Sequence, residues 1–115
     1  MKITIYGIKN CDSVKKAFAF FKDHAIDYTF VDFKISPVDQ NKILQWTKQS
    51  DISLLLNTKG TTYRTLNLKA LTLTDDDKIE WMAKDNRLIK RPVIEYNSNL
   101  IVGFNLSLYE GTFLS

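Results

Sequence analysis

The chain has 115 residues, of which 44% are hydrophobic and 25% are charged, and this is the composition of one ordinary globular domain. Its net charge of +3, from 16 Lys and Arg against 13 Asp and Glu, permits an anionic ligand but does not indicate direct binding to nucleic acid. A single cysteine excludes an internal disulfide, and no stretch approaches the about 20 apolar residues that cross a bilayer, so we expect a cytoplasmic protein without a membrane partner.

The first third of the sequence predicts a strand, a helix and a second strand. Residues 2–6 and 28–33 are rich in β-branched and aromatic side chains, which is typical of strands. Between them, apolar residues recur at helical spacing at Val14, Ala17, Phe18, Phe21 and Ala25. This helix is expected to begin within one residue of Cys11, with Asn10 or Asp12 as its cap. A helical crossover of this kind normally makes its two strands parallel.

The middle of the sequence predicts helices. Ser36 and Pro37 indicate the cap and the first position of a helix that runs to about residue 48. A short helical stretch over 52–56 and a polar loop over 57–64 are expected next. Thr74 precedes three aspartates and therefore predicts a capped helix, which should end near residue 86.

The last part of the sequence predicts a hairpin and a final helix. Residues 92–96 and 100–102 are its expected strands, 97–99 its turn, and 105–113 the helix. The element order is then βαβαααββα, which indicates one α/β domain over residues 1–115.

Cys11 lies in a polar turn between the first strand and the first helix. Backbone N–H groups and the positive end of a helix dipole meet there, and helix N-termini can lower a thiol pKa from about 8.5 to roughly 3.5–7.5. Unpaired cysteines are more often small buried residues, so a reactive thiol and an inert one are both open at this point. Val14 stands where a C-x-x-C motif would have its second thiol, and His24 is too far along the helix to act as a base.

Three cations are candidates for holding an anionic substrate near this thiol. Arg91 precedes a proline, which restricts its backbone, whereas Lys59 and Arg64 lie in the polar loop. A solvated surface charge is the commoner role for each of them. The sequence shows no cluster of metal ligands, so no metal site and no bound cofactor are expected.

Four stretches, taken together and in order, resemble the arsenate reductase ArsC/Spx family and especially its YffB-like branch. They are YGIKNCD at 6–12, LLNTKGTTYR at 55–64, IKRP at 89–92 and VGF at 102–104. The resemblance implies a thioredoxin-like α/β fold with a βαβ…ββα core and a central mixed sheet. Residues 1–35 and 87–115 would form this core, and residues 36–86 would be an inserted helical segment. It also implies a cis Arg91–Pro92 bond beside the reactive thiol.

The same resemblance implies a catalytic role for Cys11 and Arg91, with glutathione as co-substrate and glutaredoxin as a further partner in arsenate-reducing members. Our mechanistic hypothesis adds six residues that contact substrate or glutathione, namely Lys9, Asn10, Asn57, Lys59, Arg64 and Pro92. Asn57 and the Gly103-Phe104 pair stand where the arsenate enzymes have their other two arginines.

We therefore expect a glutathione-dependent monothiol reductase, in which Cys11 attacks a small oxidised or oxyanion substrate and an external thiol resolves the adduct. Two alternatives stay open. One is arsenate reduction itself. The other is a regulator that binds the RNA polymerase alpha subunit, as Spx-like relatives do, although those usually carry C-x-x-C at this turn. Nothing in the sequence indicates an obligate dimer, so a monomer is expected.

Overall fold

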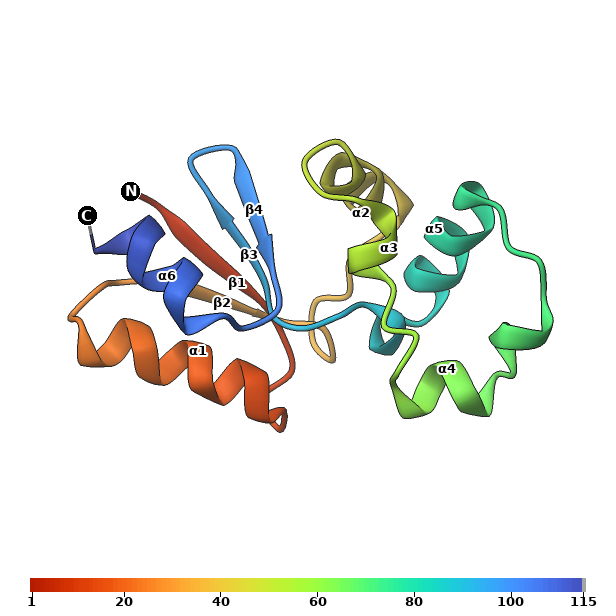
Figure 1. Cartoon of the computed structure of the whole chain (residues 1–115), viewed down its shortest axis with the longest axis horizontal. Helices are drawn as coiled ribbons and strands as arrows, with labels where there is room; N and C mark the ends of the chain where they lie inside the picture. The colour runs from red at the N-terminus through yellow and green to blue at the C-terminus, as the bar shows by residue number, and fades with distance from the viewer. Residues whose placement is uncertain (115) are drawn as a thin grey trace.

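The computed structural model describes residues 1–114, and its centre is a mixed four-stranded sheet with the strand order β2-β1-β3-β4 (Figure 1). The strand β1 (Ile3–Gly7) pairs in parallel with β2 (Thr29–Asp32) and antiparallel with β3 (Val93–Tyr96). The hairpin of β3 and β4 (Asn99–Val102) completes the sheet. This arrangement confirms the expected α/β class and the thioredoxin-like order of strands.

Helices α1 (Asp12–Asp23) and α6 (Leu106–Phe113) cover one face of this sheet (Figure 1). Alternate strand residues point into the layer between them, because side chains in a strand alternate between its faces. The buried residues of this layer are Ile3, Ile5, Ala17, Phe20, Phe21, Ile94, Ile101 and Tyr109. Phe20 therefore belongs to the core although it was not predicted. Ala25 is exposed, because α1 ends at Asp23 and Ala25 follows with a φ of 54°.

The remaining helices form a second group beside the sheet (Figure 1). They are α2 (Gln40–Thr47), α3 (Ile52–Leu55), α4 (Thr61–Thr65) and α5 (Asp75–Lys84), with the short turns η1 (Leu68–Ala70) and η2 (Asn86–Leu88). Their own core joins the sheet through Tyr6 and Val93. The molecule is consequently elongated, with extents of 43 × 27 × 26 Å.

The predicted start of α2 is wrong. Ser36 and Pro37 precede the helix, and Asp39 is its N-cap. The reason lies far away in the chain, because the Asn86 side chain accepts a hydrogen bond from the Val38 N–H and donates one to the Val38 carbonyl. The backbone groups of Val38 are thus held by Asn86 at the start of η2, and α2 begins only after them.

Two other local predictions have different outcomes. The stretch 57–64 is not wholly a loop, since α4 begins at Thr61. The cap at Thr74 is confirmed as a reciprocal capping box, in which Thr74 and Asp77 each accept a hydrogen bond from the other's backbone N–H. Among the helices of residues 1–114, none is long and apolar enough to cross a membrane.

Candidate functional site: a thiol at the N-terminus of α1

The position of the Cys11 thiol depends on a close contact that the end of β1 makes with Val14 and Arg91. Gly7 is buried, and a Cβ atom there would lie 2.8 Å from Val14 Cγ2 and 3.9 Å from Arg91 Cβ. Only glycine therefore lets the strand pass between the first turn of α1 and Arg91. The chain then turns outward through Lys9 and Asn10, both of which are exposed, and enters α1 at Cys11.

Cys11 itself is the N-cap of α1, where Asn10 or Asp12 was expected. Its backbone is extended, with φ −143° and ψ 125°, and its carbonyl accepts the first helical hydrogen bond from the Lys15 N–H at 2.9 Å. Serine, threonine, asparagine or aspartate usually occupies this position and accepts from the first-turn amides. Here no side-chain cap forms, so these amides face the sulfur instead.

The surroundings of Cys11 favour its thiolate. The side chain is partly buried, and burial by itself raises the pKa of a thiol. The Val14 N–H, the Arg91 guanidinium and the Ser13 N–H outweigh this effect, so the pKa of Cys11 is lower than its ordinary value. A larger fraction of the thiol is then ionised at neutral pH, and the thiolate is the nucleophilic form.

Arg91 is the cation that stands next to this sulfur. It precedes Pro92 through a cis peptide bond, as the resemblance implied, at the start of β3. One terminal nitrogen donates to the Arg87 carbonyl at 3.2 Å. Its Nε is buried and has no hydrogen-bond partner within residues 1–114, and no carboxylate in that range pairs with the guanidinium. Arg91 thus keeps donor capacity and charge for an anionic group beside Cys11.

Asn57 and Arg64, which were also predicted to contact substrate or glutathione, make contacts within the protein. The loop before α4 lies against the segment that leads to Arg91, because the Asn57 N–H donates to the Leu88 carbonyl at 2.8 Å. From α4, the Arg64 side chain donates to the Lys59 carbonyl of this loop at 3.1 Å and to the Thr61 hydroxyl at 3.5 Å. The Asn57 side chain packs against Gly60, where a Cβ would lie 2.7 Å from Nδ2. Asn57 and Arg64 are therefore engaged locally.

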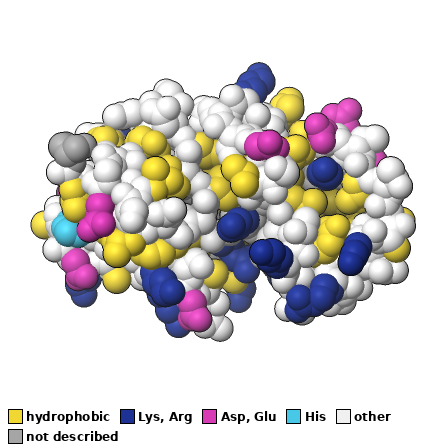
Figure 2. Space-filling model, in the orientation of Figure 1, with side chains coloured by type: hydrophobic (Ala, Val, Ile, Leu, Met, Phe, Trp, Pro, Cys, Tyr) yellow, Lys and Arg dark blue, Asp and Glu magenta, His cyan; other side chains and the backbone are white. Residues whose placement is uncertain are grey.

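Lys and Arg side chains nevertheless gather between the N-terminal end of α1 and α4 on the face that Figure 2 shows. Lys59 is exposed in the loop before α4, while Pro92 is buried and its carbonyl accepts a hydrogen bond from the Gly103 N–H at 2.7 Å. Lys90, which was not among the predicted contact residues, is exposed and directly precedes Arg91.

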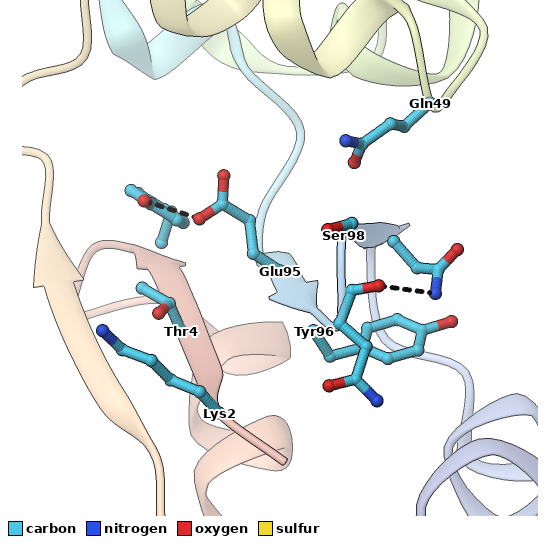
Figure 3. Close-up of a pocket in the computed structure, with 9 residues that line it drawn as sticks. Lys2, Thr4, Gln49, Glu95, Tyr96 and Ser98 are labelled. Atoms are coloured by element: carbon cyan, nitrogen blue, oxygen red, sulfur yellow. Dashed lines mark hydrogen bonds between the residues drawn. The ribbon is translucent and has the colours of Figure 1, made fainter.

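A separate hollow lies on the sheet face that α1 and α6 leave open (Figure 3). It has a volume of about 430 Å³, and its lining includes Lys2, Thr4, Gln49, Glu95 and Ser98. These residues lie around the start of β1 and the β3–β4 turn, whereas Cys11 follows the other end of β1. The Glu95 carboxylate at its edge accepts hydrogen bonds from Tyr6 and Trp46 and pairs with Lys42.

Neither a metal nor a histidine base complements the thiol in the described chain. Residues 1–114 contain no group of three or more His, Cys, Asp and Glu that could hold a metal ion. His24 is the C-cap of α1, about 20 Å along the helix from Cys11 at 1.5 Å per residue. The arrangement can therefore support attack by a thiolate, and a second thiol has to come from another molecule.

Solved structures of other proteins share this fold. The solved structure of a protein named YFFB has a TM-score of 0.89 and 34% identity, over 95% of this chain and 96% of that one. An arsenate reductase (ArsC) related protein from Brucella melitensis has a TM-score of 0.78 and 40% identity, over 98% and 95%.

A regulator is also among the relatives. The global transcriptional regulator Spx of Streptococcus pyogenes serotype M1 is 26% identical over 106 residues, which cover 90% of this chain and 78% of the regulator. A model of the ArsC family matches residues 6–112, which is nearly the whole chain. The chain therefore belongs to the ArsC family.

Proposed function

We propose that this protein is a monothiol reductase in which Cys11 attacks an oxidised sulfur and glutathione completes the cycle. The observation that carries the proposal is the pairing at the N-terminus of α1: a thiol with a lowered pKa beside an arginine whose Nε has no partner. Such a thiolate is a nucleophile that needs no separate base.

The reaction is a pair of thiol–disulfide exchanges. The Cys11 thiolate attacks the glutathione sulfur of a glutathione mixed disulfide, forms a Cys11–glutathione disulfide and releases the other sulfur as a thiolate. Glutathione thiolate then attacks the glutathione sulfur of that adduct, which yields oxidised glutathione and regenerates Cys11. Arg91 stabilises the negative charge of the bound partner, and the first-turn amides of α1 stabilise the Cys11 thiolate that leaves in the second step.

Arsenate reduction is a second candidate, supported by the name of the Brucella melitensis relative. The site is less suited to it. Asn57 packs against Gly60, and Gly103 offers no side chain, at the two positions where the resemblance places further arginines. Each hydrogen bond to a charged group is worth about 1.5–3 kcal/mol, so the loss of two weakens oxyanion binding by roughly two to four powers of ten.

A regulatory role is the third candidate, supported by the similarity to Spx. Val14 is buried at the position where a C-x-x-C switch would need a thiol, and this argues against a dithiol sensor in this chain. A pull-down with the RNA polymerase alpha subunit tests this candidate independently of any turnover.

The proposed function is tested first by the pH dependence of Cys11 alkylation. We expect an apparent pKa clearly below that of free cysteine, and a higher apparent pKa in Arg91→Ala. Arg87→Ala is the matched control, because that side chain is exposed and paired with Asp85. An ordinary pKa with slow alkylation in the wild type would sink the proposal.

Turnover is the second test of the proposed function. Glutathione-dependent reduction of a glutathione mixed disulfide should be lost in Cys11→Ser. Retained turnover in that variant would show that another group carries the reaction.

A further inference from the structure

Lys90 and Gly103 make a contact that joins the segment before Pro92 to the end of β4. A Cβ atom at Gly103 would lie 3.2 Å from Lys90 Cε and 3.8 Å from Lys90 Nζ. Gly103 has a φ of 86°, a region in which side-chain-bearing residues are strained. The space beside Gly103 is therefore filled by the Lys90 side chain, and position 103 itself supplies no side chain to the site.

The backbone fixes Lys90 in this place. Its N–H donates to the Leu55 carbonyl at 2.7 Å, and Leu56 forms a β-bridge with Ile89. On the other side, the Gly103 N–H donates to the Pro92 carbonyl at 2.7 Å. The Lys90 backbone is thus attached to the end of α3, and the nearby Pro92 backbone is attached to the residue that follows β4.

Two consecutive cations precede Pro92 and have different neighbours. Arg91 is directed toward Cys11 and the end of β1, while Lys90 lies over the end of β4, and β3 runs between those strands. Within residues 1–114, neither forms an ion pair with a carboxylate. The buried Arg91 Nε without a partner shows independently that this end of the sheet has unused donor capacity.

We propose that Lys90 is a specificity-determining residue that binds a carboxylate of an anionic thiol or disulfide while its sulfur is presented to Cys11. The proposal rests on the proposed function and names the class of molecule that this site prefers. Lys90 acts as a point charge at the β4 side of Pro92, and Arg91 acts at the thiol side. Carboxylate-bearing disulfides are favoured over neutral ones, and cationic ones are disfavoured.

The test compares single-turnover rates of mixed-disulfide formation at Cys11 with three probes of different charge. They are oxidised glutathione, which is anionic, bis(hydroxyethyl) disulfide, which is neutral, and cystamine, which is cationic. Each exchange joins the Cys11 sulfur to half of the probe and releases the other half as a thiolate. Mass spectrometry of the protein follows the adduct at about 0.1 M ionic strength, where the Debye length is about 10 Å and only nearby charges act on the probe.

The decisive variant is Lys90→Met, because methionine keeps an unbranched stem to pack on Gly103 while the charge is removed. The rate with oxidised glutathione should fall about three- to tenfold, the neutral probe should be unaffected, and cystamine should react faster. Lys22→Met is the matched control, since it removes one charge about 16 Å from Cys11, in the last turn of α1. It should leave all three rates within about twofold, at a separation beyond the Debye length.

Two outcomes overturn the proposal in distinguishable ways. If wild-type Cys11 reacts with the neutral probe no faster than free glutathione does at the same pH, the proposed function fails and the role of Lys90 fails with it. If Cys11 reacts rapidly but Lys90→Met changes all three probes equally or not at all, only the assignment of Lys90 is wrong. The neutral probe also reports whether the variant keeps a folded site.

Discussion

Replacing Glu95 should loosen the attachment of the helical group to the sheet. The Glu95 carboxylate in β3 accepts hydrogen bonds from the Tyr6 hydroxyl and the Trp46 Nε1, each at 2.8 Å, and pairs with Lys42 at 2.7 Å. Tyr6 belongs to β1, whereas Lys42 and Trp46 belong to α2. One carboxylate therefore joins both strands and helix, and its side chain is only 29% exposed.

The loss in the free energy of unfolding depends on which groups each Glu95 variant leaves without a partner. Glu95→Ala leaves the indole N–H of Trp46, a residue that is 1% exposed, without a hydrogen-bond acceptor, which costs about 1–3 kcal/mol of stability. It also removes a partly screened ion pair worth about 1 kcal/mol. We expect a total loss of about 2–4 kcal/mol in the free energy of unfolding. Glu95→Gln keeps one acceptor oxygen and should cost about 1–2 kcal/mol.

The pH dependence supplies a second signature. Burial raises the pKa of the Glu95 carboxyl, but the hydrogen bonds from Lys42, Trp46 and Tyr6 outweigh it, so the pKa in the folded protein lies below the ordinary value. As the pH falls, the Glu95 carboxyl is therefore protonated at a higher pH in the unfolded state than in the folded state. The stabilisation is complete above the unfolded pKa of about 4.3 and is lost as the pH falls through the folded pKa.

The assay is urea unfolding followed by far-UV circular dichroism between pH 7 and pH 3. The difference between wild type and Glu95→Gln should be constant down to about pH 5 and should shrink below about pH 4. Glu80→Gln is the control, because the Glu80 side chain is exposed and makes no hydrogen bond or ion pair within the described chain. A Glu95→Gln stability within 0.5 kcal/mol of wild type at pH 7, with the same pH profile, would refute this reasoning.

Two further substitutions test the placement of the thiol and of α2. Gly7→Ala puts a Cβ 2.8 Å from Val14 Cγ2 in a fully buried contact, so we expect a loss of about 1–3 kcal/mol in urea unfolding and slower alkylation of Cys11. Gly111→Ala, whose Cβ would meet nothing within 4 Å, should cause neither effect, and equal behaviour of the two variants would contradict the steric argument. Asn86→Ala removes both hydrogen bonds to Val38 and should cost about 2–4 kcal/mol, and a loss under 0.5 kcal/mol would show that solvent replaces them.

Features that depend on near neighbours in the chain were predictable. The alternation in β1 and the crossover through α1 require only the periodicity of apolar side chains, and the structure confirms both. The capping box at Thr74 needs a partner three residues away, and it was likewise found in the sequence. The turn that carries Cys11 was located for the same reason, because the change from strand period to helix period marks it.

The tertiary structure decided features that depend on residues far apart in the chain. The start of α2 followed the side chain of Asn86 rather than Ser36 and Pro37, because a buried side chain that satisfies both backbone groups of Val38 outweighs a local cap. The sequence offered Arg91 as one of three candidate cations near Cys11, and only the resemblance to a family gave it a catalytic role. Local spacing indicates which residues can form an element, but only folding determines which distant groups share a desolvated site and so which cation remains unpaired beside the thiol.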